Sequence, residues 1–290
     1  MPFLNSMLIL YFRDSLSSCI GKGSFGVVYR GVETTTGKAV AIKKLPKSQL
    51  KGNELKVMKA VTSKYLVALI DICTDNTDYM YIIMELCDID LEQHLRYRTE
   101  KGYLPENDLK ILIDNVTRGY YALYECNIVH RDLKPQNILV TYDPVSHGFK
   151  SAKITDFGIS RILTEEQNQA LSNIAGTFFY MAPEVGANIL TTTEYNYEVD
   201  MWSLGCVFYQ CITGQVPFDE CRLCRIFLFT ASGNYDAYDK PDIPDDLEEE
   251  VRFLVDSLLE IDSSKRITPK KLIIICSCQD YYYYYYCYGY

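Results

Sequence analysis

The chain has 290 residues, of which 48% are hydrophobic and 23% charged, and its net charge is −9. This length predicts one large domain or two closely joined lobes, and the composition is that of a globular protein. The negative charge argues against nucleic acid or an anionic membrane surface as the main partner.

The cysteines and the N-terminal residues bear on the cellular compartment. Cys221 and Cys224 form one C-x-x-C pair, but no second pair stands at zinc-finger spacing. Cys276 and Cys278 form a C-x-C, and most of the other cysteines lie in apolar runs, as buried free thiols do: Cys73, Cys87, Cys126, Cys206 and Cys211. The apolar run at residues 7–12 is too short for the core of a signal peptide, and no run is long enough to span a bilayer. We therefore expect a cytoplasmic protein with reduced cysteines and no transmembrane segment.

The first part of the chain, residues 16–86, is rich in β-forming side chains. Residues 34–37 (TTTG) predict a hairpin turn between two strands. Apolar side chains within residues 52–62 have helical spacing, so a small mixed lobe with one main helix is predicted. The predicted strands cover residues 17–20, 27–32, 40–42, 66–72 and 79–84.

From residue 87 onward the pattern is mostly helical. Apolar side chains recur at three- and four-residue steps from Leu109 to Leu123, and Pro105 followed by acidic residues suits a helix start. Further helices are predicted over residues 198–213 and after Glu248. The final helical pattern fades after Leu272 into a low-complexity end with eight tyrosines in the last ten residues.

Three glycines, Gly21, Gly23 and Gly26, form a G-x-G-x-x-G pattern between two predicted strands. The pattern alone is weak, because dinucleotide-binding folds also carry it, followed there by a helix. Here residues 27–29 have strand character, which favours a phosphate-covering hairpin. Glycines let backbone N–H groups approach phosphates without a Cβ clash, and Phe25 at the tip would cap the cleft.

Two later segments supply the polar groups of a phosphotransfer site. HRDLKPQN at residues 130–137 provides a carboxylate for a hydroxyl, a lysine for a phosphate and an amide oxygen for a metal. DFG at residues 156–158 provides a second metal ligand, and Lys43 ends an apolar strand upstream. This order of residue types predicts transfer of the γ-phosphoryl group of ATP to a protein side chain.

Together with Ala182-Pro183-Glu184, Asp200 and Arg266, these motifs resemble the signature set of the eukaryotic protein kinases. The resemblance covers residues 17–272 and implies an α+β, bilobal protein kinase fold. A small β-rich N-lobe with one main helix would occupy about residues 17–86, and a larger, mainly α-helical C-lobe about residues 87–272. Residues 1–16 would form an N-terminal extension and residues 273–290 a tyrosine-rich tail.

The resemblance also implies roles for single residues. Asp132 would orient the substrate hydroxyl, and Lys134 would steady the γ-phosphate. Lys43 would contact the α- and β-phosphates while paired with Glu54, and Asn137 and Asp156 would hold Mg²⁺. The catalytic set is then Asp132, Lys134, Asn137, Lys43 and Glu54.

The same resemblance implies an adenine pocket. Met84 would stand at its back, Glu85 and Cys87 would offer backbone groups to the adenine edge, and Asp90 would reach the ribose. The residues expected around ATP are Ile20, Gly21, Lys22, Gly23, Ser24, Phe25, Gly26, Val28, Ala41, Lys43, Met84, Glu85, Cys87, Asp90, Leu139 and Asp156.

The acceptor class and the subfamily follow from finer features. Lys134 within DLKPQN, and Gly176-Thr177 before Tyr180, resemble serine/threonine kinases, so the expected partners are protein substrates with Ser or Thr acceptors. Gln136 offers no acidic subsite beside the catalytic loop. The stretch 141–151 and the segment 209–218 look like those of the autophagy-initiating kinases, with other serine/threonine branches as the alternative.

The residues expected to regulate activity depart from the family pattern at one point. The Lys43–Glu54 spacing is shorter than the family usually has, which puts that ion pair in doubt. Arg131 resembles the receptor for an activating phosphate, and Ser172 lies where an upstream kinase or autophosphorylation would place one. Glu184 and Arg266 resemble a buried anchoring pair. A pseudokinase or scaffold that keeps the fold is the alternative to an active enzyme.

Overall fold

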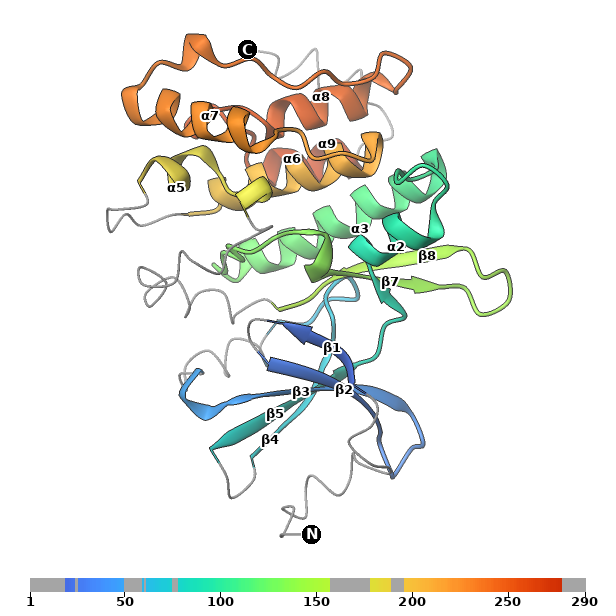
Figure 1. Ribbon diagram of the computed structural model, residues 1–290. Helices are drawn as coiled ribbons and strands as arrows, with labels where there is room; N and C mark the ends of the chain where they lie inside the picture. The colour runs from blue at the N-terminus through green and yellow to red at the C-terminus, as the bar shows by residue number, and fades with distance from the viewer. Residues whose placement is uncertain are drawn as a thin grey trace.

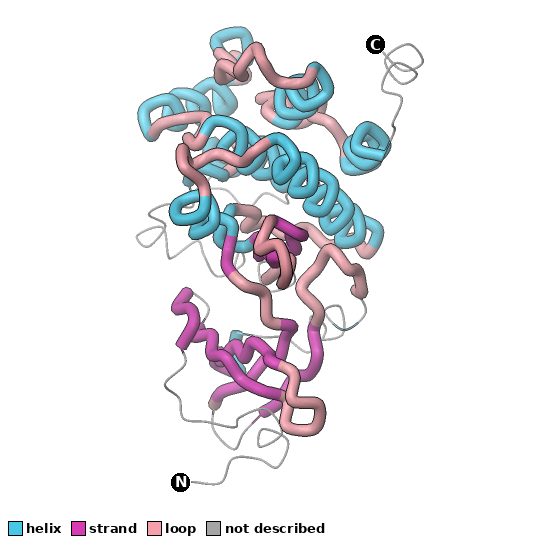
Figure 2. Tube along the Cα trace, turned by 90° about the vertical axis from the view of Figure 1, so that its right-hand side faces the viewer, coloured by secondary structure: helices cyan, strands magenta, loops and turns pink. Residues whose placement is uncertain are grey.

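The chain folds into a strand-rich lobe and a helical lobe, stacked one upon the other (Figures 1 and 2). Strands gather at one end and helices at the other, and the segment after β5 runs from one lobe into the other. This is the bilobal α+β arrangement predicted above. The computed structural model describes residues 19–23, 26–49, 59, 61–74, 78–156, 178–188 and 196–277.

The smaller lobe is built on a five-stranded antiparallel sheet in the order β1-β2-β3-β5-β4. β3 lies at its centre, and its apolar side chains Val40, Ile42 and Leu45 are fully buried, as expected for a strand covered on both faces. The predicted turn at residues 34–37 joins β2 to β3, with Gly37 at φ 74°, where a side chain would be strained. The strands are β1 (Cys19–Gly23), β2 (Gly26–Val32), β3 (Ala39–Pro46), β4 (Leu69–Thr74) and β5 (Tyr79–Glu85).

The larger lobe packs its helices around α6, which is almost wholly buried. Its Trp202 ring stacks on Phe218, with ring centroids 5.6 Å apart. A three-stranded sheet in the order β6-β7-β8 faces the smaller lobe. The helices are α2 (Leu91–Arg98), α3 (Glu106–Glu125), α5 (Pro183–Ala187), α6 (Glu198–Thr213), α7 (Glu220–Ser232), α8 (Glu249–Leu258) and α9 (Pro269–Ser277). The strands are β6 (Ile89–Asp90), β7 (Ile138–Tyr142) and β8 (Phe149–Ile154), and short 3-10 turns are η2 (Lys47–Gln49), η3 (Pro135–Asn137), η6 (Phe178–Tyr180) and η7 (Tyr235–Ala237).

The segment before β4 connects the lobes instead of extending the strand. The prediction of a strand from residue 66 is wrong at its start, because β4 begins at Leu69. The Val67 N–H donates to the Ile154 carbonyl (2.9 Å), and the Ile154 N–H donates to the Tyr65 carbonyl (3.1 Å). This segment also packs so closely on α3 that a Cβ added at Gly119 would lie 2.8 Å from the Tyr65 carbonyl oxygen. Pairing with β8 therefore takes the backbone groups that a longer β4 would have used.

The last described helix, α9, differs from the expected loss of helix after Leu272. It continues to Ser277, because Leu272 and Ile275 are buried against the larger lobe. The Cys276 thiol also lies 3.6 Å from the Thr117 hydroxyl oxygen of α3. A boundary for the tail at residue 273 is therefore too early. The N-terminal extension, most of the predicted helix at residues 52–62 and the tyrosine run lie outside the described residues.

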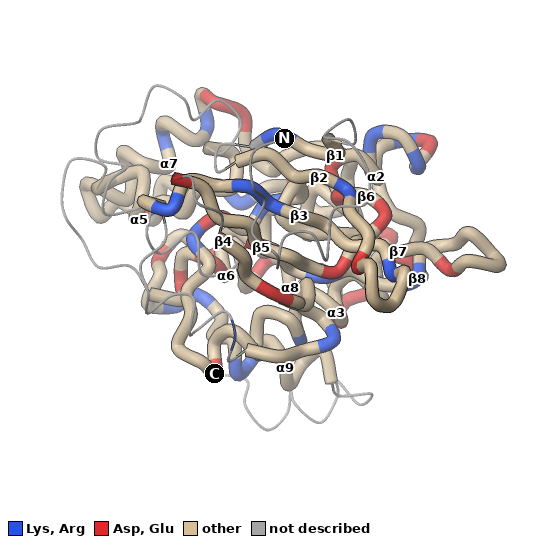
Figure 3. Tube along the Cα trace, turned by 90° about the horizontal axis from the view of Figure 1, so that it is seen from below, with Lys and Arg blue, Asp and Glu red and all other residues tan. Residues whose placement is uncertain are grey.

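Charge and cysteine chemistry are unexceptional over the described part of the chain. Lys/Arg and Asp/Glu residues are interspersed along both lobes (Figure 3). The nine cysteines in the described residues are free thiols. Among those residues, no helix combines the length and the apolar character that a membrane crossing requires.

Candidate active site

A cleft of about 600 Å³ lies between the lobes. Its walls come from β1–β3, from the connection after β5 and from the segment 132–139. Most of the expected nucleotide residues line it: Ile20, Gly21, Lys22, Gly26, Val28, Ala41, Lys43, Met84, Glu85, Cys87, Asp90, Leu139 and Asp156. Gly23 ends β1 opposite Gly26, whereas Ser24 and Phe25 lie outside the described residues.

Lys43 joins the smaller lobe to the DFG aspartate. Its side chain is buried on the central strand β3, where it pairs in register with Val28 and Ile82. The Lys43 Nζ lies 2.7 Å from Asp156 Oδ1. Asp156 is held at φ 63°, an uncommon conformation for a residue other than glycine. Glu54 lies outside the described residues, so its pairing with Lys43 stays a prediction.

Three polar side chains of the catalytic loop hold one another. The Lys134 Nζ lies 2.8 Å from Asp132 Oδ1, and Asn137 Nδ2 donates to Asp132 Oδ2 (2.9 Å) and to the Asp132 carbonyl (2.7 Å). The turn η3 makes these contacts possible, because it brings Asn137 back toward Asp132. The Asp132 carboxylate is therefore oriented from two sides at the floor of the cleft.

A buried carboxylate anchors this loop from below. Asp200, in the first turn of α6, is fully buried. Its oxygens accept hydrogen bonds from the backbone N–H groups of His130 (2.6 Å) and Arg131 (2.7 Å). Arg131 has φ 63°, a conformation that needs such support. Burial raises the pKa of Asp200, and the backbone donors oppose that rise by favouring the charged form.

The residues proposed for Mg²⁺ have the right donor chemistry. Asp156 brings a carboxylate to the cleft, and Asn137 uses its Nδ2 on Asp132, which leaves its Oδ1 as the ligand atom. Mg²⁺ in nucleotide sites takes one or two protein oxygens together with substrate phosphates. The described residues therefore fit the cation that the sequence predicted.

The connection between the lobes uses its side chains for structure. Glu85 forms an ion pair with Lys153 of β8, and burial followed by the Glu85 charge raises the pKa of the Cys87 thiol to about 12. Asp90 caps α2 by accepting a hydrogen bond from the Gln93 N–H (2.9 Å). Its carboxylate therefore serves the helix, while its place in the cleft wall matches the expectation.

Sequence reasoning missed several residues of the cleft and one beside it. Gln136 itself is neutral, but its Nε2 donates to Glu92 Oε2 (3.3 Å), so an acidic side chain of α2 lies beside the catalytic loop. Tertiary packing brings α2 there, and no local motif signals it. The missed cleft residues are Val67, Leu86, Asp88, Ile89, Gln93, Gln136 and Thr155.

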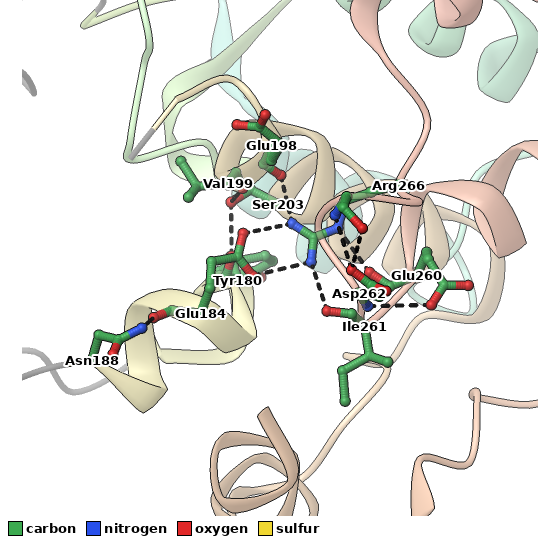
Figure 4. Close-up of polar contacts among 11 residues, drawn as sticks. Tyr180, Glu184, Asn188, Glu198, Val199, Ser203, Glu260, Ile261, Asp262 and Arg266 are labelled. Atoms are coloured by element: carbon green, nitrogen blue, oxygen red, sulfur yellow. Dashed lines mark hydrogen bonds and ion pairs between the residues drawn. The ribbon is translucent and has the colours of Figure 1, made fainter. Parts of the chain in front are cut away.

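The predicted pair of Glu184 and Arg266 is confirmed. Nη1 and Nη2 of the Arg266 guanidinium lie 2.7 and 3.1 Å from Oε1 and Oε2 of Glu184, respectively (Figure 4). Arg266 also donates to the backbone carbonyls of Glu198 and Glu260. The pair therefore ties α5 to the start of α6 and to the segment before α9.

Comparison with known proteins agrees with this geometry. Residues 15–275 match the protein kinase domain family. The chain belongs to the eukaryotic protein kinases. Its relatives place this kinase domain in the serine/threonine class: the probable serine/threonine-protein kinase fhkD of Dictyostelium discoideum is 32% identical over 93% of the chain.

Two further relatives carry the same class name. The serine/threonine-protein kinase fused of Drosophila melanogaster is 32% identical over 90% of the chain, and the serine/threonine-protein kinase RAD53 of Saccharomyces cerevisiae is 30% identical over 90%. The kinase domain covers 37%, 31% and 33% of the fhkD, fused and RAD53 proteins respectively. The chain thus spans about a third of the length of these relatives.

Proposed function

We propose that this chain transfers the γ-phosphoryl group of ATP to serine and threonine hydroxyls of protein substrates. The observation that carries the proposal is the convergence of Lys43, Asp132, Lys134, Asn137 and Asp156 on one cleft between the lobes. These side chains come from three separate segments of the chain, and their chemistry fits phosphoryl transfer.

Each of these residues has a role in the reaction that follows from its position in the cleft. Asp132, held by Lys134 and Asn137, accepts the proton of the acceptor hydroxyl or orients that hydroxyl for in-line attack. The ammonium groups of Lys43 and Lys134 offset charge on the phosphates, with Lys43 exchanging its contact with Asp156 for a phosphate oxygen. Asn137 and Asp156 would hold Mg²⁺, which would supply positive charge to offset that of the phosphates. Positioning and charge account for the rate, because little covalent chemistry is required of the protein.

The proposal is tested by a phosphotransfer assay with radiolabelled ATP, Mg²⁺ and a generic basic protein. Asp132→Asn should lower kcat by at least about a hundredfold, because the carboxylate that orients the hydroxyl is lost. The control is Asp246→Asn, which removes a carboxylate from an exposed loop of the larger lobe and should change nothing. Equal phosphotransfer by the wild-type chain and by Asp132→Asn would contradict the proposal.

The same assay separates the enzyme from the pseudokinase or scaffold alternative. A pseudokinase would bind ATP, if at all, without transfer in any variant. Phosphoamino-acid analysis of the product should show phosphoserine or phosphothreonine, as Lys134 within the DLKPQN segment favours. Phosphotyrosine as the main product would refute the acceptor class.

Regulation and cellular role belong to the same proposal. Phosphorylation of Ser172, by an upstream kinase or by the chain itself, would activate the enzyme through Arg131; Ser172 lies outside the described residues. Ser172→Ala should then lower activity, and unchanged turnover would refute this step. An autophagy-type signalling role in the cytoplasm rests on the stretch 141–151 and the segment 209–218. Normal starvation-induced autophagosome formation in cells lacking the protein would contradict that role.

A further inference from the structure

Tyr120 reaches the catalytic loop from outside the cleft. It lies on α3, its side chain is fully buried, and it is not among the residues that line the cleft. Its phenol hydroxyl donates a 2.9 Å hydrogen bond to Asp200 Oδ2. The contact joins α3 to the carboxylate of α6 that already holds the backbone N–H groups of His130 and Arg131.

We infer that Tyr120 is a positioning residue of the phosphotransfer site, acting through Asp200 on the backbone that carries Asp132. This inference rests on the proposed function for its activity measurements. Three groups donate hydrogen bonds to the Asp200 carboxylate. Only the Tyr120 hydroxyl among these three belongs to a side chain, so a substitution can remove it.

The geometry places this anchor directly before the catalytic aspartate. Asp200 Oδ2 accepts both the His130 N–H (2.6 Å) and the Tyr120 hydroxyl, and Oδ1 accepts the Arg131 N–H (2.7 Å). The two N–H groups belong to the two residues that precede Asp132. Arg131 at φ 63° keeps its left-handed conformation only where surrounding contacts demand it. Loosening the carboxylate therefore frees the peptide units that orient Asp132.

The charges around Asp200 show why the hydroxyl matters. Burial raises the pKa of Asp200, while the His130 imidazole, the two backbone donors and the Tyr120 hydroxyl oppose that rise. Burial, and next the Asp200 charge, raise the pKa of Tyr120 well above its usual value, so the phenol stays a donor; Glu198 and Tyr124 also face it. Removing the hydroxyl favours a protonated Asp200, which is a weaker acceptor for backbone N–H groups.

The test compares Tyr120→Phe with Tyr121→Phe, because phenylalanine keeps the ring and removes only the hydroxyl. Tyr121 is the matched control: it lies on the same helix, and its hydroxyl bonds Glu125 instead of Asp200. Tyr120→Phe should lower kcat about tenfold with KM for ATP within about twofold, and should move the acid limb of the kcat–pH profile to higher pH. Tyr121→Phe should match the wild type in all three measurements.

Two further measurements separate positioning from general stability. In an Asp200→Asn background, Tyr120→Phe should have no further effect on kcat, because a residue acting through Asp200 is coupled to it. Hydrogen exchange of the peptide spanning residues 128–133 should be about tenfold faster in Tyr120→Phe than in Tyr121→Phe. This exchange measurement does not depend on activity.

The outcomes are distinct. An unmoved acid limb with unchanged exchange at residues 128–133 would overturn the inference, and so would an equal loss of kcat in the wild-type and Asp200→Asn backgrounds. A wild-type chain without phosphotransfer would refute the proposed function, while the exchange measurement would still decide whether Tyr120 holds the loop.

Discussion

Two ion pairs of the larger lobe show how burial sets the importance of a single charge. The Arg266 side chain is fully buried, with its Nη1 2.7 Å from Glu184 Oε1. Arg252 and Asp245 approach to 3.0 Å, but the Asp245 side chain is 95% exposed. Breaking a buried pair leaves a desolvated charge without its partner, whereas a surface pair exchanges one solvated state for another. Similar distances therefore carry different energies.

We predict that Glu184→Ala lowers the free energy of unfolding by about 3–5 kcal/mol, because it leaves the Arg266 guanidinium buried without a countercharge. Asp245→Ala, the exposed counterpart, should cost less than about 1 kcal/mol. Urea denaturation of both variants measures the two values. A loss at Glu184 no larger than the loss at Asp245 would show that the anchoring pair does not stabilise the lobe.

At the scale of elements, α2 is joined to the β7–β8 hairpin through a buried histidine. His94 Nδ1 lies 2.8 Å from the Tyr142 hydroxyl, and its ring meets Phe149 edge-on at 5.2 Å. Burial, and next the Arg98 charge, lower the pKa of His94. The Arg98 guanidinium itself lies over the Tyr142 ring at 5.3 Å. A proton on His94 would therefore be buried beside another cation.

The sign of the pH effect follows from this lowered pKa. Below the ordinary histidine pKa of 6.5, the unfolded chain binds a proton that the folded His94 resists, so stability falls as the pH falls. His94 should therefore contribute a loss of stability as the pH falls from 7.5 to 5.5. Urea midpoints at both pH values should show a smaller loss for His94→Gln, whereas His147→Gln, at the exposed hairpin tip, should behave as wild type. An identical loss in all three proteins would exclude His94 as the source.

For the whole molecule, one group of described contacts between the lobes lies at the end of β8. Backbone hydrogen bonds join residues 65–67 to Ile154, and one residue before Ile154 the Lys153 ammonium pairs with Glu85 at the end of β5. Both side chains of that pair are mostly buried, at 18% and 20% exposure. The ion pair and the backbone bridge therefore restrain the same opening motion.

We predict that Lys153→Met speeds hydrogen exchange at Val67 and Ile154 about fivefold, since losing a partly buried ion pair costs about 1 kcal/mol. Lys150→Met removes an exposed lysine from the same strand and serves as the control. Exchange resolved by NMR reports on each amide separately. Unchanged exchange in Lys153→Met would mean that the Lys153–Glu85 ion pair does not restrain this opening motion.

The pattern of apolar residues predicted a helix or strand well where the local sequence alone decides which side chains are buried. The helix predicted over residues 198–213 coincides with α6 (Glu198–Thr213), because a helix buried nearly all round is apolar along its whole length. The start of β4 and the end of α9 were wrong for the opposite reason, since contacts with β8 and α3 decide them. In the site, the five polar motif residues that the structure describes line one cleft, but Glu92 beside Gln136 was missed.

The sequence by itself determined the chemistry of this protein: a glycine-rich loop, a lysine, two metal ligands and a hydroxyl-orienting aspartate in the order of a serine/threonine kinase. Residue types and short spacings are local, so they can be read without the fold. Only the tertiary structure decided which groups hold that chemistry in place, such as Tyr120 on Asp200 and Lys153 on Glu85. The partners lie 80 residues apart in the first case and 68 in the second. No local sequence pattern indicates such contacts, because only the packing of the fold brings the partners together.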